Sequence, residues 1–194
     1  MKVVLFVGSV RPGRMAERVA KMVRNYISQW GDIEVITFDP LEKSHLTEVR
    51  EPVHFSSNPS ENLLTDQETI ENADGFIVVC SEYNRSIPPV CSAMMCNFPP
   101  KSYAAKPVVF VNYSLGQYGG VSATMNLRQF CTELSMIPLQ ASINLPLVNK
   151  TVSEDGHLED ATYERQMERA FSQLLWYARV MRKARIEGDD PFPA

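Results

Sequence analysis

The chain has 194 residues, of which 44% are hydrophobic and 22% are charged, and its formal net charge is −4. This length suits one domain with a substantial core, and the composition is ordinary for a soluble globular protein. The small negative charge, without a basic stripe, argues against binding to a nucleic acid backbone. No apolar run approaches the roughly 20 residues of a membrane-spanning helix. We therefore expect neither nucleic acid nor membrane as a partner.

The termini and the cysteines indicate a cytoplasmic protein. The start, MKVVLFVGSVRPGR, fits a first strand better than a signal peptide. Two disulfides are conceivable, but buried reduced thiols are the better interpretation, because the cysteines lie in apolar segments of a mid-sized chain. No bound metal is expected, since no second Cys or His pair accompanies the closest pair of cysteines to complete a tetrahedral site. The four cysteines are Cys80, Cys91, Cys96 and Cys131.

Along the chain, short β-branched runs alternate with amphipathic stretches. Residues 40–64 contain three prolines and little periodicity, so we expect a long surface loop there. Thr65, with Glu68 three residues later, is typical of a helix start and predicts a short helix over 66–73. The expected strands are 2–8, 33–38, 75–80, 108–113 and 136–143. The other expected helices cover about 15–30, the stretch from Pro88, 119–134 and 161–185.

Five strands alternating with helices predict an α/β protein with a parallel sheet covered on both faces. No break in composition marks a second domain, so residues 1–186 are expected to form one domain. The acidic, proline-containing residues 187–194 are expected to form a disordered or loosely packed tail. In such sheets ligands bind at the carboxyl ends of strands, which directs attention to the segments after strands one, three and four.

The segment after the first strand is GSVRPGR, residues 8–14. A glycine-bearing turn that leads into a helix offers unpaired backbone N–H groups to an anion, and Ser9, Arg11 and Arg14 add a hydroxyl and two charges. The segment lacks the Gly-Lys-Ser/Thr ending of a P-loop and does not match G-x-G-x-x-G, so neither nucleotide site is favoured. A phosphate site and a plain turn with solvated arginines both remain open on this loop alone.

Two further strand ends carry polar or glycine-rich segments. Three glycines after the fourth strand, in NYSLGQYGG (112–120), let the backbone approach a flat ligand closely, although such loops are common. After the third strand, SEYNRS (81–86) provides a ring, donors and acceptors where a short turn would suffice. This segment suits the wall of a site for a planar, hydrogen-bonding ligand. The alternative is a surface loop that caps the next helix.

Together the three segments resemble the NADPH-dependent FMN reductase family. The resemblance covers roughly residues 2–180 and rests on GSVRPGR (8–14), ADGFIVVCSEYNRSIPPV (73–90) and YSLGQYGGVSATMNLRQFCTELSMIPL (113–139). It implies a flavodoxin-like three-layer α/β/α sandwich with a five-stranded parallel sheet in the order 2-1-3-4-5. It also implies bound FMN, NADPH or NADH as co-substrate, and a homodimer or tetramer.

The resemblance also implies roles for individual residues. The FMN phosphate and ribityl chain would be held by Ser9, Arg11, Arg14, Met15 and Ala16. The isoalloxazine ring would be lined by Ser81, Glu82, Tyr83 and Asn84. Its other edge would be closed by Ser114, Gly116, Gly119 and Gly120. The chain departs from the family in three places: Ser81 replaces a proline, Arg14 stands where many relatives have a serine, and CSAMMCNF (91–98) lacks the usual Asp-Trp pair of a helix that commonly contributes to the dimer.

The expected function is that of an NAD(P)H-dependent FMN reductase related to quinone reductases. Hydride would pass from NAD(P)H to bound FMN, and electrons would pass to a small acceptor by a ping-pong mechanism. Quinones, azo compounds, free flavin and metal oxyanions all suit this class. No protein acid or base is needed, so no catalytic side chain is expected. The alternatives are a flavodoxin-type electron carrier and a non-catalytic flavin-binding scaffold or regulatory protein.

Overall fold

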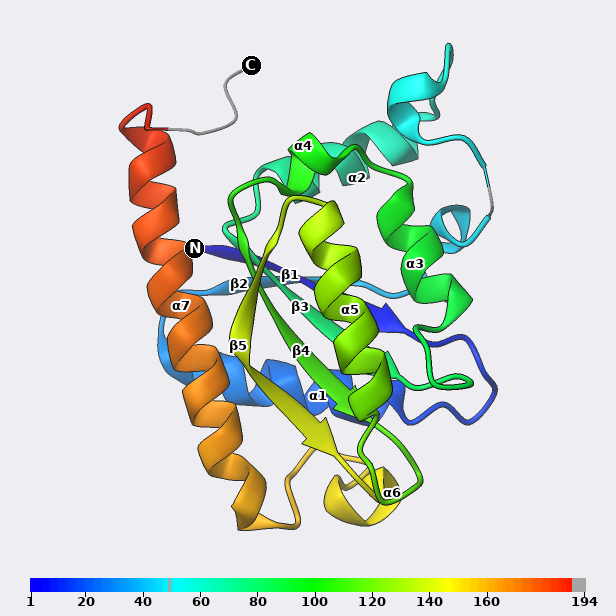
Figure 1. Cartoon of the computed structure of the whole chain (residues 1–194), viewed down its shortest axis with the longest axis vertical. Helices are drawn as coiled ribbons and strands as arrows, with labels where there is room; N and C mark the ends of the chain where they lie inside the picture. Colours follow the sequence, from blue (N-terminus) through cyan, green and yellow to red (C-terminus); the bar gives the residue numbers. More distant parts are fainter. Residues whose placement is uncertain (49, 190–194) are drawn as a thin grey trace.

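The computed structural model, which describes residues 1–48 and 50–189, contains one sheet of five parallel strands (Figure 1). The strand order is β2-β1-β3-β4-β5, so the predicted order is confirmed. All five strands lie within two residues of their predicted bounds, because each is an apolar, β-branched run. They are β1 (Lys2–Gly8), β2 (Glu34–Phe38), β3 (Gly75–Ser81), β4 (Pro107–Tyr113) and β5 (Ile137–Leu145).

Helices cover both faces of the sheet, as the alternation of elements predicts (Figure 1). One face packs against α1 (Ala16–Ile27) and α7 (Glu164–Ile186). The other face packs against α2 (Glu61–Glu71), α3 (Pro89–Cys96), α4 (Pro100–Tyr103) and α5 (Val121–Glu133). The short helix α6 (Val148–Thr151) follows β5, and four 3-10 turns cover 28–30, 44–46, 53–55 and 161–163.

The core lies in two layers, one on each side of the sheet. In β1, Val3 and Leu5 pack on the α1 and α7 side, whereas Val4 and Phe6 pack on the α2 to α5 side. Alternate residues of a strand point to opposite faces, so a strand buried on both faces must be apolar throughout. Every residue of β3 and β4 is buried. The sheet therefore gives a rigid base for the loops at its carboxyl edge.

Two helix starts differ from the predictions. Helix α2 begins at Glu61 rather than near 66, with Ser60 before it. Thr65 is inside the helix, where its hydroxyl donates to the Glu61 carbonyl, so its prediction as a cap was wrong. The first turn of α2 contains Glu61, Asn62, the buried Leu63 and the exposed Leu64, so it shows no clear apolar face and periodicity did not reveal it. Helix α7 begins at Glu164, after a 3-10 turn.

The segment expected as a surface loop is partly anchored in the core. Leu46 and Val53 are buried in it. The Asp66 carboxylate of α2, itself buried, contacts Lys43 Nζ at 2.5 Å and His45 Nε2 at 2.7 Å. His45 in this segment is therefore tied to α2.

Other expectations concern the cysteines and the chain ends. All four cysteines are free, but Cys96 is exposed, so the expectation of burial was wrong for this residue. Residues 187–189 close the end of α7 with backbone hydrogen bonds, and residues 190–194 of the expected tail lie outside the described residues. Among residues 1–48 and 50–189, no helix is both long and apolar enough to cross a membrane.

Candidate functional site

A cavity of about 400 Å³ opens at the carboxyl ends of β1, β3 and β4. Strands β1 and β3 are neighbours, and the chain passes from β1 to the edge strand β2 before returning to β3. The cavity therefore lies beside the point where the strand order reverses, which is the usual ligand position in such sheets. It is lined by Ser9, Arg11, Pro12, Gly13, Arg14, Met15, Ser81, Glu82, Tyr83, Tyr113, Ser114, Leu115 and Gly116.

The loop between β1 and α1 is fixed by a turn and a buried ion pair. The Arg14 N–H donates to the Arg11 carbonyl at 3.1 Å, and Gly13 takes the positive φ of +67° that this Pro-Gly turn requires. The Arg14 guanidinium makes two hydrogen bonds to Asp39, at 2.8 and 2.5 Å, and one to the Ser9 carbonyl at 2.7 Å. Arg14 is therefore occupied in holding the loop to the end of β2.

Arg11 is placed differently. Its guanidinium lies over the ring of Tyr83, 3.6 Å from the centroid, and its side chain is exposed to the cavity. This is a cation–π contact. The Tyr83 hydroxyl in turn lies 3.0 Å from Ser9 Oγ. The loops after β1 and β3 thus contact each other across one wall of the cavity.

The start of α1 adds unpaired backbone donors to the same wall. No side chain caps this helix, whose first residue is Ala16. The first N–H groups of an α-helix have no partner within the helix and carry a partial positive charge. Ala16 is fully buried, so only its backbone could contribute to binding.

The segment after β3 forms a tight two-residue turn. Tyr83 and Ser86 exchange backbone hydrogen bonds at 3.0 and 2.9 Å. Asn84 and Arg85, between them, have φ of +52° and +65°. Positive φ at both central positions is the pattern of a type I′ turn, which prefers Asn or Gly. Residues 83–86 therefore form a tight, hydrogen-bonded turn and not an extended loop.

Glu82 connects this turn to the next strand end. Its Oε2 accepts hydrogen bonds from the backbone N–H of Ser122 at 2.9 Å and of Ala123 at 3.4 Å. These groups belong to the first turn of α5, where a carboxylate is favoured by the helix dipole. Glu82 therefore borders the cavity but directs this oxygen to α5.

The loop after β4 is held by the end of β5. Ser114 N–H donates to the Leu145 carbonyl at 3.1 Å, and Leu147 N–H donates to the Gly116 carbonyl at 3.0 Å. Gly119 has φ of +61°, and a Cβ on it would lie 2.9 Å from the Asn144 carbonyl carbon. No other residue fits there without displacing the backbone.

Two buried hydroxyls give the cavity its polar floor. Ser81 Oγ is buried and has no hydrogen-bond partner of good geometry among the described residues. Burial raises the pKa of Tyr113 well above its usual value, and the nearby hydroxyls of Ser81 and Ser9 oppose that rise only in part. Tyr113 therefore remains a neutral phenol. A buried hydroxyl without a partner is unusual in a native protein, and a ligand at this position would satisfy it.

The structure brings most of the predicted site residues together. The predicted residues that line the cavity are Ser9, Arg11, Arg14, Met15, Ser81, Glu82, Tyr83, Ser114 and Gly116. Those outside its lining are Ala16, Asn84, Gly119 and Gly120, which shape the surrounding backbone. Sequence reasoning missed Tyr113, although it directly precedes Ser114, because its aromatic ring was counted as part of the strand. It also missed Asp39, since no motif links this residue to Arg14.

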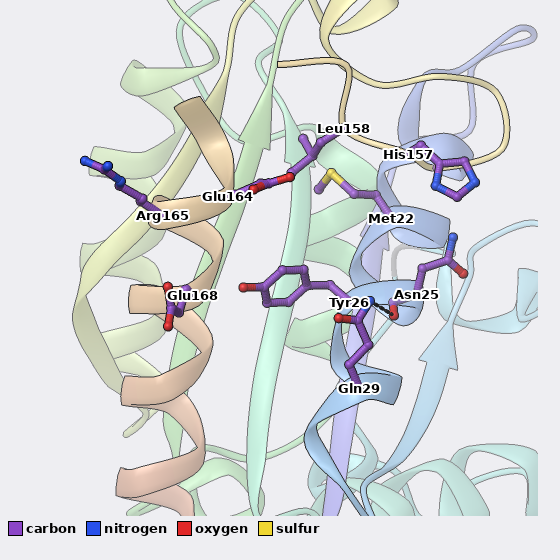
Figure 2. A pocket seen from close by; sticks show the side chains of 10 residues that line it. Met22, Asn25, Tyr26, Gln29, His157, Leu158, Glu164, Arg165 and Glu168 are labelled. Atoms are coloured by element: carbon purple, nitrogen blue, oxygen red, sulfur yellow. Dashed lines mark hydrogen bonds between the residues drawn. The ribbon is translucent and has the colours of Figure 1, made fainter. Parts of the chain in front are cut away.

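A second cavity, of about 460 Å³, lies between α1 and α7 (Figure 2). Figure 2 shows the Tyr26 ring extending from α1 toward Glu168 on α7, while Arg165 points away. Burial raises the pKa of Tyr26, and the charges of Glu168 and Glu164 raise it further. Most polar side chains around this cavity are exposed to solvent, and none has a buried atom without a partner. The cavity at the strand ends is therefore the better candidate site.

Comparison with known proteins identifies a family and several solved structures that this chain is similar to. Residues 1–150 match the family described as NADPH-dependent FMN reductase. Among solved structures, the chain is similar to FerB, a flavoenzyme NAD(P)H:(acceptor) oxidoreductase from Paracoccus denitrificans. The TM-score is 0.72 and the identity is 17%, over 94% of this chain and 97% of that chain.

Two further structures show the same fold. An oxidoreductase from Corynebacterium diphtheriae matches with a TM-score of 0.70 and 11% identity, over 91% of this chain and 96% of that chain. The apo form of the NADH:FMN oxidoreductase EmoB matches with a TM-score of 0.61 and 17% identity, over 94% of this chain and 89% of that chain. The expected flavodoxin-like fold is confirmed.

Proposed function

The chain belongs to the NADPH-dependent FMN reductase family, and on that premise we propose that the cavity at the strand ends is its FMN site. As a family member it is a flavin-dependent NAD(P)H oxidoreductase, with FMN as cofactor and NAD(P)H as co-substrate. The proposal assigns the phosphate to the β1–α1 loop and the start of α1, and the ring system to the segments after β3 and β4.

The cavity suits the three chemical parts of FMN. The phosphate requires donors and positive charge, which the α1 N-terminus, Ser9 and Arg11 offer. The ribityl hydroxyls require polar partners, and the flat ring requires flat or small walls, which Tyr83 and Gly116 provide. The observation that carries the proposal is Ser81 Oγ, a buried hydroxyl at the floor of this cavity that has no hydrogen-bond partner of good geometry in the described part of the chain. Arg14 departs from its expected role, because its guanidinium is paired with Asp39.

The chemistry that FMN would supply when bound is redox chemistry, as hydride acceptor from NAD(P)H and electron donor to an acceptor. The protein binds and orients the reactants. Tyr83 is fixed by Ser9, and Glu82 holds the start of α5 to the segment after β3. No side chain is required to move a proton. We propose that nucleotide and acceptor use the cavity mouth in turn, in a ping-pong order, with a quinone, azo compound, flavin or metal oxyanion as acceptor.

The proposal extends to the assembly and location of the protein. Residues 1–186 would act as one FMN-binding domain in a cytoplasmic homodimer or tetramer. Large exposed apolar side chains on the loop after β4, the start of α5 and the segment after β5 support a partner subunit on this side. They are Leu115, Tyr118, Val121, Met125 and Leu147.

A visible spectrum of the purified protein after incubation with FMN, followed by anaerobic addition of NADPH or NADH, tests the proposal. We expect retained yellow colour that either or both nucleotides bleach. A protein that takes up no FMN would overturn the site. A yellow protein that neither nucleotide bleaches would instead indicate an electron carrier or a flavin-binding scaffold. Stopped-flow mixing with a quinone then tests the ping-pong order, which predicts reoxidation only after the oxidised nucleotide leaves.

A further inference from the structure

Arg85 occupies a backbone position that disfavours it. Its φ is +65°, in the second central position of the turn formed by residues 83–86. Glycine or asparagine is favoured there, because a Cβ in the left-handed region is strained. The adjacent Asn84, at +52°, is one of the residues that tolerate this region. Strained residues of this kind cluster at functional sites, where the surrounding structure holds them.

Helix α5 fixes the backbone of Arg85, whereas the guanidinium of Arg85 is exposed to solvent. Asn126 Nδ2 donates to the Arg85 carbonyl at 2.9 Å, which fixes the strained peptide to α5. The guanidinium lies 3.4 Å from Ser122 Oγ and 5.9 Å from the centroid of the exposed Tyr118 ring. No carboxylate among residues 1–48 and 50–189 forms an ion pair with it.

The two arginines of the neighbouring loop are engaged differently. Arg14 is paired with Asp39, and Arg11 lies over Tyr83 at the wall proposed for the FMN phosphate. Arg85 faces the other side of that turn, between the segment after β3 and the start of α5. The nearby Glu82 forms no ion pair with Arg85 among the described residues, and its Oε2 accepts hydrogen bonds from the α5 backbone.

We propose that Arg85 receives a phosphate group of the reducing nucleotide at the rim of the flavin site, which rests on the proposed function. A guanidinium binds phosphate through charge-assisted, bidentate hydrogen bonds. Tyr118 beside it offers an exposed ring on which the adenine can stack. The 2′-phosphate and the diphosphate of NADPH share this chemistry. If Arg85 binds the 2′-phosphate, it sets the preference for NADPH over NADH.

Calorimetric titration with adenosine 2′,5′-bisphosphate and with 5′-AMP tests the proposal without turnover. In Arg85→Gly we expect the affinity for the bisphosphate to fall about tenfold, and in Arg85→Lys to fall less. If the affinity falls only for the bisphosphate, Arg85 binds the 2′-phosphate. If the affinities for both ligands fall equally, Arg85 binds at the position of the diphosphate. Unchanged affinity for both in Arg85→Gly would overturn the proposal. Arg165→Ala, which removes an exposed positive charge from α7, is the matched control.

Steady-state kinetics of the FMN-loaded protein provide a second measurement. We expect Arg85→Gly to raise KM for the affected nucleotide about tenfold while kcat and FMN affinity stay near wild type. Its melting temperature should rise, because glycine adopts φ of +65° without strain. Failure of the wild type to take up FMN would overturn the proposed function, yet the titration would still decide the role of Arg85. An active enzyme with unchanged KM values in Arg85→Gly would overturn the role of Arg85 alone.

Discussion

The loops after β1 and β3 border the same cavity but are held in place by different means. The first loop contains a glycine at its positive-φ position and is fixed by the Arg14–Asp39 ion pair, whose side chains are 8% and 13% exposed. The second contains no glycine, although two of its residues, Asn84 and Arg85, have positive φ. It is fixed through hydrogen bonds to α5. The difference indicates that the first loop depends on a buried charge pair, whereas the second depends on the placement of a neighbouring helix.

Breaking the ion pair should have the largest effect. Asp39→Asn would leave the Arg14 charge buried without a counterion, so the free energy of unfolding should fall by about 3 kcal/mol. Urea denaturation measures this change. Asp155→Asn, which removes an exposed partner of Lys21, should cost under about 0.5 kcal/mol. A loss below about 1 kcal/mol in Asp39→Asn would show that the pair does not hold the first loop.

The next effect concerns FMN affinity. Arg11→Ala should weaken FMN binding about tenfold to a hundredfold, because a hydrogen bond to a charged group contributes about 1.5–3 kcal/mol. Tyr83→Ala should weaken binding less, although it also removes the ring under Arg11. Fluorescence titration with FMN measures both variants. Tyr83→Phe keeps the ring and removes only the contact with Ser9. Equal affinities in the two alanine variants would contradict the phosphate assignment.

The link between the second loop and α5 should contribute less. Glu82→Gln removes the negative charge at the start of α5, and we expect the free energy of unfolding to fall by about 1 kcal/mol. Glu133→Gln, at the other end of the same helix, removes a charge that opposes the dipole and should be neutral or slightly stabilising. Thermal denaturation measures the loss of stability in each of the two variants relative to wild type. Equal losses in the two variants would contradict a specific role for Glu82.

The smallest effect is expected at Ser81. Ser81→Ala removes a buried hydroxyl for which residues 1–48 and 50–189 offer no hydrogen-bond partner of good geometry, so the FMN-free protein should be unchanged or more stable by up to about 1 kcal/mol. FMN should stabilise this variant less than it stabilises wild type, because one hydrogen bond to the ligand is lost. Melting temperatures with and without FMN measure both quantities. A variant that is less stable without FMN would show that the hydroxyl already has a partner.

The sequence predicts the sheet, and the edge of the sheet at which the candidate site lies, because both follow from local patterns. Apolar runs mark the strands, and the polar segments at 9–14, 81–86 and 112–120 mark their carboxyl ends. The contacts within the site are less predictable. Arg14 and Asp39 lie 25 positions apart, and nothing local distinguishes an arginine that binds phosphate from one that binds a carboxylate. Glu82 could equally have faced a ligand or a helix, and only the placement of α5 decides between them.

The hydrogen bonds between the β4 loop and the end of β5 have a consequence for biosynthesis. Ser114 is fixed by Leu145, and Gly119 accepts a hydrogen bond from Asn144 at 3.2 Å. While the ribosome is still making β5, the loop after β4 has none of these contacts, although the loops after β1 and β3 have already emerged. A truncated nascent chain that ends before Asn144 would therefore present only part of the proposed FMN site, so we expect cofactor loading to follow the emergence of β5 from the ribosomal exit tunnel.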